Sequence, residues 1–387
     1  MTELKEQHMS TETTVGEICQ IMDRAYPPHL AESWDSVGLI CGRREAPVRQ
    51  VAFALDCTGE VADAAVAAGV DMLIVHHPLL LRGVDSVAAD TPKGRILHSL
   101  IEAGIALFAA HTNADSARPG VNDKLAELVG ITPGRPLAPK PGPGRHLWGV
   151  HVPAAHAEPL KQALFAAGAG RIGNYSECVY EIAGTGQFKP EPGADPTDGE
   201  VGHTYRDDEL RIQFVAKPGD KQVLLNALYA HHPYEEPAFD ITELADATPL
   251  ESAYGLGRIG KLPEPMSLRE FSQQVADVLP ATSWGVRAAG DPNKQVQTVA
   301  VASGAGDGFI ATAAKLGADV FVTSDLRHHP VDEHLRTSDM AIIDTAHWAS
   351  EFPWTAQAEE IVRREAGVKT TILQVRTDPW TMSVHKG

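Results

Sequence analysis

The sequence predicts an α/β protein: a duplicated core of sheets flanked by helices, interrupted by an inserted α+β domain. Short apolar segments alternate with helical patterns, which is typical of a sheet covered by helices on both faces. Two parts of the chain resemble each other, and a Pro/Gly-rich linker opens the segment between them. We therefore expect a tail at 1–13, core halves at 14–141 and 251–387, and the inserted domain at 142–250.

The first half of the core begins with a helix and continues with strands and helices in alternation. Thr14 and Glu17 have the spacing of a capping box, which predicts a helix start. Three apolar runs predict buried strands, at 51–55, 71–75 and 105–110. Helical patterns connect these strands, one capped by Thr58 and one at about 93–103.

The second half repeats this order. Apolar runs predict strands at 296–302, 319–323 and 340–344, and the pattern at 307–316 predicts a helix. AAVAAGVDMLIVHHP resembles ATAAKLGADVFVTSDLRHHP, and GIALFAAHTNAD resembles DMAIIDTAHWASE, which indicates an internal duplication. In both halves polar side chains follow strand ends, where open α/β sheets place their binding clefts.

The segment between the halves predicts a small α+β domain. Strands are expected near 150–152, 178–182 and 209–215, with helices near 157–167 and 221–229, and the sheet should be mixed or antiparallel. A second cluster with metal-binding residue types occurs here, at His231, His232, Glu235 and Glu236. Because that cluster lies in the inserted domain, we interpret it as a structural turn.

Composition excludes several classes of function. The 33 basic and 51 acidic side chains give a net charge of 33 − 51 = −18, without a basic run, so nucleic acid and anionic membranes are not expected partners. Apolar stretches long enough to span a membrane and an apolar signal segment are absent from the sequence. The four cysteines are scattered without a CxxC pair. We expect a cytoplasmic protein that acts on a small molecule.

His76 and His77 directly follow the second predicted strand, so the core fixes their position. Pro78 restricts His77 to an extended conformation, in which neighbouring side chains diverge and could bind different ions. Adjacent histidines are also common in surface loops. The pair alone therefore does not specify a metal site.

Two further pairs of ligand-type residues follow later strands. His111 and Asp115 leave the third strand, and His347 and Glu351 are four residues apart, on one face of a predicted helix. Imidazole and carboxylate are ligands of Zn²⁺, Fe²⁺ and Mn²⁺. Each pair also has an ordinary alternative, either a polar turn or an exposed ion pair.

The combination of these residues predicts two divalent metal ions in one cleft, with Glu351 as the bridging carboxylate. We expect one ion on His77, Asp115 and Glu351 and the other on His76, His347 and Glu351. Three protein ligands per ion would leave positions for water, as in catalytic sites. Four further residues are expected to line the cleft or support the ligands: His111, Asp325, His328 and His329.

These motifs, in this order, resemble the NIF3-like (DUF34) dinuclear-metal family, whose members carry the label GTP cyclohydrolase 1 type 2 homologue. The matching stretches are WDSVGL (34–39), HHP (76–78), HTNAD (111–115), GVND (120–123), GLGRIG (255–260), TSD (323–325) and HWASE (347–351). The inserted segment resembles the PII/CutA-like domain of the longer members through GRIGNY (170–175), GTG (184–186) and HPYEEP (232–237).

The resemblance implies a metal pair on the five residues His76, His77, Asp115, His347 and Glu351, and a ring-shaped homohexamer. Through the family label it also implies a nucleotide substrate. Ser324 departs from the family, which usually carries Gly at that position. We predict a metal-dependent hydrolase that acts on a nucleotide or a related small molecule. The alternative is a non-enzymatic metal-handling or regulatory protein, with small-molecule sensing by the inserted domain.

Overall fold

The computed structural model describes residues 13–142 and 144–384. The chain divides into two compact units: one combines the residues up to Lys140 with those from Pro249, and the other runs from Pro141 to Thr248. The tail predicted at 1–13 lies outside the described residues except for Thr13. The carbonyl of Thr13 accepts a hydrogen bond from the amide of Val48 at 2.7 Å, so this residue is tied to the fold.

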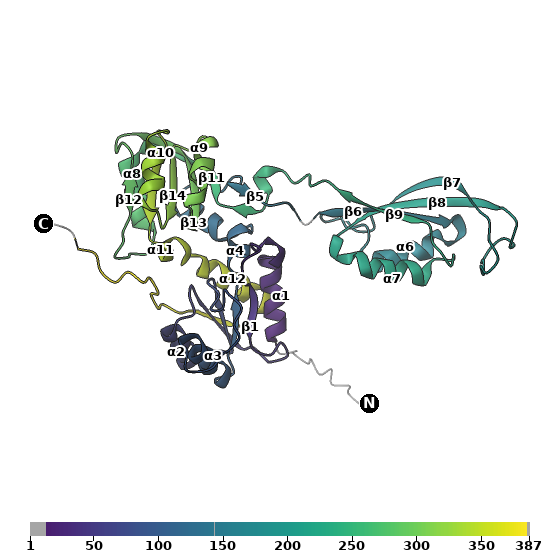
Figure 1. Ribbon diagram of the computed structural model, residues 1–387, viewed down its shortest axis with the longest axis horizontal. Helices are drawn as coiled ribbons and strands as arrows, with labels where there is room; N and C mark the ends of the chain where they lie inside the picture. Colours follow the sequence, from purple (N-terminus) through teal and green to yellow (C-terminus); the bar gives the residue numbers. More distant parts are fainter. Residues whose placement is uncertain (1–12, 143, 385–387) are drawn as a thin grey trace, which may run out of the picture. The chain divides into compact units, whose positions relative to one another are not determined.

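The described residues of the first unit form two five-stranded sheets, which Figure 1 shows in the N-terminal and C-terminal parts of the core. The strand order of the first sheet is β1-β4-β3-β2-β16. Its strands are β1 (Gly38–Cys41), β2 (Gln50–Ala54), β3 (Met72–Val75), β4 (Ala106–Ala109) and β16 (Lys369–Ile372). Only β1 is antiparallel to its neighbour. The C-terminal β16 thus completes the sheet of the first half.

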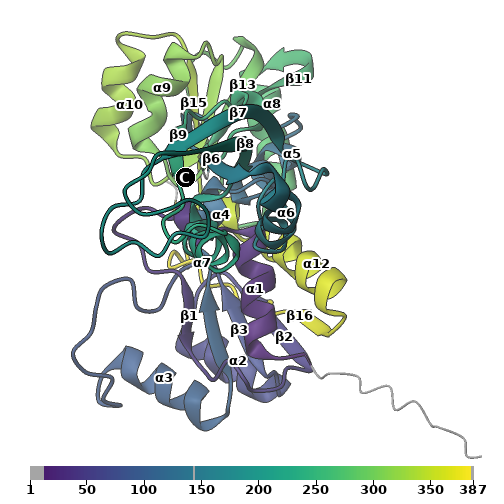
Figure 2. The same ribbon diagram turned by 90° about the vertical axis from the view of Figure 1, so that its right-hand side faces the viewer.

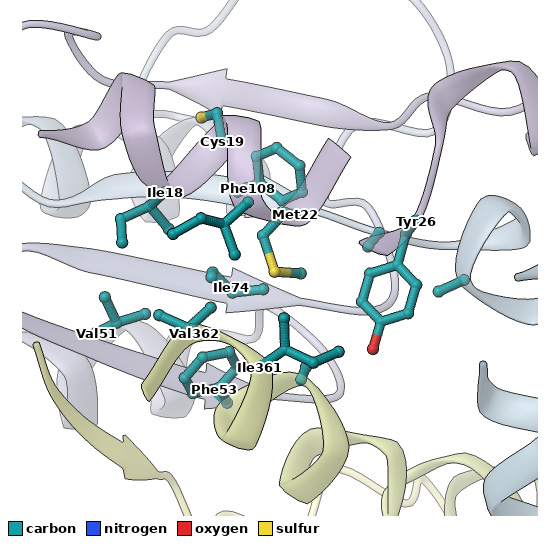
Figure 3. Close-up of a cluster of buried hydrophobic side chains, with 14 of the residues drawn as sticks. Ile18, Cys19, Met22, Tyr26, Val51, Phe53, Ile74, Phe108, Ile361 and Val362 are labelled. Carbon is teal, nitrogen blue, oxygen red and sulfur yellow. The ribbon is translucent and has the colours of Figure 1, made fainter. Parts of the chain in front are cut away.

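Helices cover both faces of this sheet, as predicted. On one face pack α1 (Val15–Ala25) and α12 (Trp354–Ala366), and on the other α2 (Gly59–Ala68) and α3 (Pro92–Glu102). Figure 3 shows the first interface, which includes Ile18, Met22, Phe53, Ile74, Phe108 and Ile361. The next residues along the strands belong to the opposite interface, because side chains alternate between the faces of a strand.

The ends of the helices follow the sequence signals. The side chain of Thr14 accepts from the amide of Glu17 at 3.3 Å, and the Glu17 carboxylate accepts from the amide of Thr14 at 2.8 Å, which completes the capping box. Thr58 caps α2, and Gly69 ends it in the left-handed conformation. No helix within 13–142 and 144–384 has the length and apolar character needed to cross a membrane.

The second sheet has the order β11-β13-β14-β15-β12. Its strands are β11 (Arg258–Ser267), β12 (Arg287–Ala289), β13 (Gln295–Ala305), β14 (Val320–Ser324) and β15 (Ala341–Thr345). The three central strands are parallel and the two edge strands antiparallel. The remaining helices of the unit are α4 (Thr112–Ser116), α5 (Val121–Leu128), α8 (Leu268–Val278), α9 (Ile310–Lys315), α10 (His328–Leu335) and α11 (His347–Glu351).

The two sheets repeat one local arrangement. In each, three parallel strands follow in chain order and an antiparallel strand pairs with the third. Asp71, before β3, accepts hydrogen bonds from two successive amides at the start of β2, and Asp319, before β14, accepts from two successive amides within β13. Gly69 and Gly317 precede these aspartates and both have positive φ. The same residue types therefore perform the same structural task in both halves.

A buried ion pair connects the halves. Arg258 is fully buried, and its Nε and Nη2 donate to the carboxylate of Asp123 at 2.7 and 2.8 Å. The same guanidinium donates to three carbonyl oxygens, those of Ala117, Gly255 and Gly257. The GVND and GLGRIG motifs thus meet in one hydrogen-bonded contact that joins α5 to β11.

The second unit has a four-stranded antiparallel sheet of order β7-β8-β6-β9. Its elements are β6 (Arg145–Pro153), α6 (Ala157–Ala166), β7 (Tyr180–Phe188), β8 (Tyr205–Ala216), α7 (Lys221–His231) and β9 (Phe239–Leu244). This is the β-α-β-β-α-β arrangement of ferredoxin-like domains. Trp148, Val150, Ile212 and Phe214 pack with leucines of α6 and α7, so the helices cover one face of the sheet.

Candidate metal centre

The polar side chains at the ends of β3, β4 and β15 meet in the first unit. His76 and His77 follow β3, Asp115 lies on α4, and His347 and Glu351 are the first and last residues of α11. Figures 1 and 2 show α4 between the two sheets. The carboxyl ends of parallel strands share one edge of a sheet, and here the edges of both sheets contribute to one cluster.

The described residues contain three overlapping groups of potential metal ligands. Within each group the ligand atoms lie within 4.8 Å of one another. The groups are His76 with Asp115 and Glu351, His77 with His347 and Glu351, and His76 with His77 and His111. Glu351 divides its two oxygens between the first two groups. Its Oε1 lies 3.8 Å from His76 Nε2, and its Oε2 lies 2.9 Å from His77 Nε2 and 3.0 Å from His347 Nε2.

The pairing of histidines differs from the expected one. His76, rather than His77, lies with Asp115, at 3.6 Å between Nε2 and Oδ1. His76 points into the core, where its Nδ1 donates to the carbonyl of Ala110 at the end of β4. The Nδ1 atom of His77 instead lies 2.7 Å from Asp56, and its ring lies 5.3 Å from that of His347. Neighbouring side chains in an extended segment diverge, and the core fixes which of them faces inward.

Each of the four histidines has its Nδ1 atom held by an oxygen. The distances are 2.8 Å from His76 to Ala110 O, 2.7 Å from His77 to Asp56, 2.8 Å from His111 to Asp35 and 2.6 Å from His347 to Asp325. Such contacts fix the tautomer and ring orientation of histidine ligands and leave Nε2 free to bind. The cluster therefore has both the ligands and the supporting groups of a metal site.

The pKa values of the cluster are set by burial and by the contacts between its histidines and carboxylates. Burial favours the neutral carboxyl group, but His347 and His77 hold the pKa of Glu351 well below its usual value. The charge of Glu351 in turn raises the pKa of His347 to about 11. Burial lowers the pKa of His76 to about 3, and burial together with Glu351 raises the pKa of Asp115 to about 7. Protonated histidines thus neutralise Glu351, a task that divalent ions would perform.

Two buried ligand atoms support this interpretation. Among the described residues, His76 Nε2 and Glu351 Oε2 have no hydrogen-bond partner, although Oε2 makes the close ion-pair contacts with His77 and His347. A buried polar atom without a partner costs about 1–3 kcal/mol. Imidazole nitrogen and carboxylate oxygen are a donor set suited to Zn²⁺, Fe²⁺ and Mn²⁺, so the residues fit a divalent ion.

Gly304, which lies in β13 where its register with β14 shifts between Val301 and Ala305, makes room for the ligands. It has a φ of +61°, and a Cβ atom there would lie 2.3 Å from Glu351 Oε1 and 3.2 Å from His347. Its amide donates to the Ser350 hydroxyl, which places β13 directly against α11. Only glycine therefore allows Glu351 to occupy its position.

Gly304→Ala is expected to displace Glu351 and to lower metal affinity by at least about tenfold, comparable to the loss of a supporting contact. The left-handed backbone adds a stability cost of about 1–2 kcal/mol. Gly317→Ala is the matched control, because Gly317 has a φ of +79° and open space around the added Cβ. Competition with a chromophoric chelator measures the affinity. Equal metal binding by the two variants would contradict this role of Gly304.

The remaining predicted residues divide into two groups. His111 lies among the ligand atoms and Asp325 supports His347, so both belong to the cluster. Ser324 stands where the family usually carries Gly, and its hydroxyl hydrogen-bonds to Thr345 and Ser350. Asp325 still reaches His347 with this serine beside it. His328 and His329 are exposed at the start of α10 and belong to no ligand group of the described residues. The rings of His328 and His329 contact each other instead.

Asp35, Asp56 and Gly304 were not among the predicted site residues. Asp56 lies two residues after the end of β2, so the strand-end signal that selected His76 applies to it as well. Asp35 lies in the WDSVGL motif, and the sequence alone gives it no partner.

The second cluster of metal-binding residue types, around His232 in the inserted segment, is a turn in the described residues. His232 Nε2 there donates to the carbonyl of His151 at 2.8 Å.

Asp56→Asn is expected to weaken metal binding by about 10–100-fold, because the supporting contact to His77 loses its charge and its fixed polarity. Asp332→Asn removes a carboxylate that pairs with Arg336 on α10 and serves as the control. Titration of the metal-free proteins with Zn²⁺ against a competing chelator compares the three affinities. An Asp56→Asn protein with wild-type affinity would exclude this supporting role.

A cavity of about 430 Å³ opens beside the cluster. His77 and His347 form part of its wall, and Trp284, Asp378 and Trp380 form another part. The rings of Trp284 and Trp380 lie 5.9 Å apart, and Arg287 lies 4.2 Å above Trp284. The segment after β16 thus reaches from the first sheet to the second and closes one side of the cavity.

An α/β core that joins four histidines and two carboxylates from both ends of its sequence, beside a cavity, defines a protein with a candidate metal centre. The chain belongs to the Duf34/NIF3 (NGG1p interacting factor 3) family, which matches residues 13–379. It is 50% identical over 376 residues to the Mycobacterium tuberculosis GTP cyclohydrolase 1 type 2 homolog, covering 96% of this chain and 98% of that protein. The Bacillus subtilis protein of the same name is 36% identical over 369 residues, covering 94% and 97%.

A solved structure agrees with this assignment. The crystal structure of the Bacillus cereus protein related to NIF3 has a TM-score of 0.79 and 35% sequence identity, and the match covers 97% of this chain and 100% of that one. The fold described above is therefore that of NIF3-related proteins.

Proposed function

We propose that this protein is a metal-dependent hydrolase that holds two divalent ions, Zn, Fe or Mn, in the cleft between its sheets. His76, Asp115 and Glu351 would bind one ion, and His77, His347 and Glu351 the other. The anchoring of all four Nδ1 atoms around the buried Glu351 and the partly buried Asp115 is the observation that carries this proposal. His111 would complete the group around His76 and His77.

A bound pair of divalent ions would lower the pKa of water and polarise a carbonyl or phosphoryl oxygen of the substrate. The residues of the chain would do the rest. Glu351 would keep the two ligand groups together through its separate oxygens, and Asp56, Asp35 and Asp325 would hold the imidazoles in the binding orientation. The buried position of Glu351 keeps bulk water from competing for its oxygens.

A nucleotide or a related small molecule is the proposed substrate. The cavity beside the cluster has an aromatic wall, formed by Trp284 and Trp380, on which a planar heterocycle can stack. The name of the two relatives, GTP cyclohydrolase 1 type 2 homolog, supports the same class of substrate. A shared fold and site do not fix a reaction, so turnover decides the substrate.

The competing proposal is a non-enzymatic metal-handling or regulatory protein. The division of the chain into a metal-binding unit and a separate compact unit favours it, because the second unit could sense a small molecule. In that case the cluster would store or sense the metal and release no product.

Turnover by the metal-loaded protein separates the two proposals. GTP, other nucleotides, phosphoesters and cyclic amides are incubated with wild type, with Asp325→Asn and with Trp380→Ala, and products are quantified. An enzyme would turn over at least one substrate, lose activity with chelation, and show a raised KM in Trp380→Ala. If the loaded protein converts none of these substrates, the hydrolase proposal is rejected and the metal-handling proposal is retained.

We further propose that the second unit is a PII/CutA-like domain and that the core arose by duplication. The β-α-β-β-α-β order supports the former. The repeated strand order and the equivalent roles of Asp71 and Asp319 support the latter. Residues 14–141 with 251–387, and 142–250, remain the proposed domain limits.

The assembly and compartment are proposals as well. A homohexameric ring follows from the family resemblance, and sedimentation of the full chain tests it, with a mass of six chains expected and a monomer contradicting it. All four cysteines are free, which supports a reducing compartment such as the cytoplasm.

A further inference from the structure

A cavity of about 720 Å³ is lined entirely by residues of the second unit. Its floor is the sheet face opposite α6 and α7. His151, Glu209 and Arg211 alternate along β6 and β8 with the residues that pack on the helices, so they point to this face. Small-molecule sites are commonly about 300–1,000 Å³ in volume, and this cavity falls in that range.

Two of the three stretches that resemble the PII/CutA-like domain, GTG and HPYEEP, contribute residues to this cavity. Gly184, Thr185 and Gly186 of β7 line one side, and Tyr234, Glu235 and Glu236 line another. The connection between β7 and β8 supplies further wall residues, which are Pro190, Ala194, Pro196 and Thr197. The connection is held in place because Thr197 donates to the carbonyl of Pro233 and the Asp195 amide donates to Glu235.

Two glycines, Gly186 and Gly149, leave space on the floor of the cavity for the side chains of Glu209 and Arg211. A Cβ atom at Gly186 would lie 2.1 Å from the carboxyl carbon of Glu209, and one at Gly149 would lie 2.3 Å from Arg211 Nη2. The side chains of Glu209 and Arg211 therefore lie flat across neighbouring strands. Their positions are fixed further by hydrogen bonds, from the Tyr234 hydroxyl to Glu209 at 3.2 Å and from Arg211 to Asp240 at 3.1 Å.

The charge of the cavity is negative. Arg211 is compensated by Asp240, at 2.8 Å from Nη1 to Oδ1. In the part of the chain that the structure describes, no basic side chain pairs with Glu209, Glu235 or Glu236. The side chain of Glu209 is half-buried on the floor of the cavity. A cationic ligand would supply the missing partner.

The remaining wall is apolar and aromatic. Phe188 lies 5.2 Å from the Tyr234 ring and 5.4 Å from the Tyr205 ring, and Ile182 and Pro196 complete this side. Aromatic faces attract cations as well as apolar groups. The wall therefore suits the body of a ligand whose charged end reaches Glu209.

We propose that this cavity binds a small organic amine with an apolar or aromatic body. The ammonium group binds the carboxylate of Glu209 beside the Tyr234 hydroxyl, and the body packs on Phe188 and Ile182. This site deepens the regulatory role proposed for the second unit. It does not depend on the metal centre, whose residues all lie in the first unit.

Calorimetry on the full-length, metal-loaded protein tests the site with three amines, which are tryptamine, tyramine and spermidine. Indole-3-propionate, which carries a carboxylate in place of the amine, is the matched anion. At least one aromatic amine is expected to bind saturably to wild type, with at least about tenfold weaker binding to Glu209→Gln. Glu243→Gln is the control, because Glu243 is exposed on β9 and lies outside the cavity lining.

Two results would overturn the proposal: no saturable binding of any of the three amines at millimolar concentration, or equal binding by wild type and Glu209→Gln. Circular dichroism and thermal unfolding establish that the Glu209→Gln protein is folded. The same titration on Glu351→Gln protein separates this site from the metal centre. Amine binding there is expected to equal that of wild type, whether or not the metal proposal survives.

Discussion

Glu351→Gln is expected to lose both metal ions, with affinity reduced by at least about 100-fold. Changes in groups that merely support a ligand cost about 10–100-fold, and Glu351 is the only residue shared by the groups around His76–Asp115 and His77–His347. The amide keeps the size of the side chain but lacks the charge that both ions require. Equilibrium dialysis with Zn²⁺ and with Mn²⁺, followed by elemental analysis, measures the loss.

Glu360→Gln is the matched control for this experiment. Glu360 lies on α12, pairs with Arg363 and is partly exposed, so the same chemical change there should leave metal binding unaltered. Tight binding of even one ion by Glu351→Gln would show that the carboxylate is not shared between the two groups.

Arg258→Met is expected to destabilise the protein by about 3–5 kcal/mol, the cost of removing one partner from a buried ion pair. The change leaves the carboxylate of Asp123 buried without its partner and removes the donors to Ala117, Gly255 and Gly257. Urea unfolding followed by circular dichroism gives the free energy of unfolding, with an unchanged urea dependence expected.

Arg336→Met controls for the loss of an arginine. Arg336 is exposed and pairs with Asp332 one helical turn away, so its removal should cost no more than about 0.5 kcal/mol. The double variant Arg258→Met/Asp123→Leu should recover part of the loss, because it removes the unpaired charge as well. A loss below about 1 kcal/mol in the single variant would mean that the ion pair does not join the halves.

The sequence predicted the central strands of both sheets because their apolar runs are long and fully buried. The strand-end signal also selected His76, which directly follows β3, and His347, which lies two residues after β15, and both are in the overlapping groups of potential ligands. The capping box at Thr14 and the helix cap at Thr58 depend on residues within one turn, and both signals were correct. Local chemistry was therefore sufficient for these features.

Long-range contacts could not be predicted in the same way. The edge strands β1, β12 and β16 are short or partly exposed and lack a strong pattern. The choice between His76 and His77 as the partner of Asp115 depends on which ring the core buries. Gly304 acts only through Glu351, which is 47 positions later in the chain, and Asp35 acts only through His111.

Metal content per chain tests the central claim most directly. Full-length protein is stripped with chelator, reloaded with Zn²⁺ or Mn²⁺, freed of excess metal and analysed for its elemental composition. Close to two equivalents per chain are expected, because Glu351 joins two ligand groups in one cleft. One equivalent or less after reloading with either metal would contradict the two-ion centre and the hydrolase proposed on it.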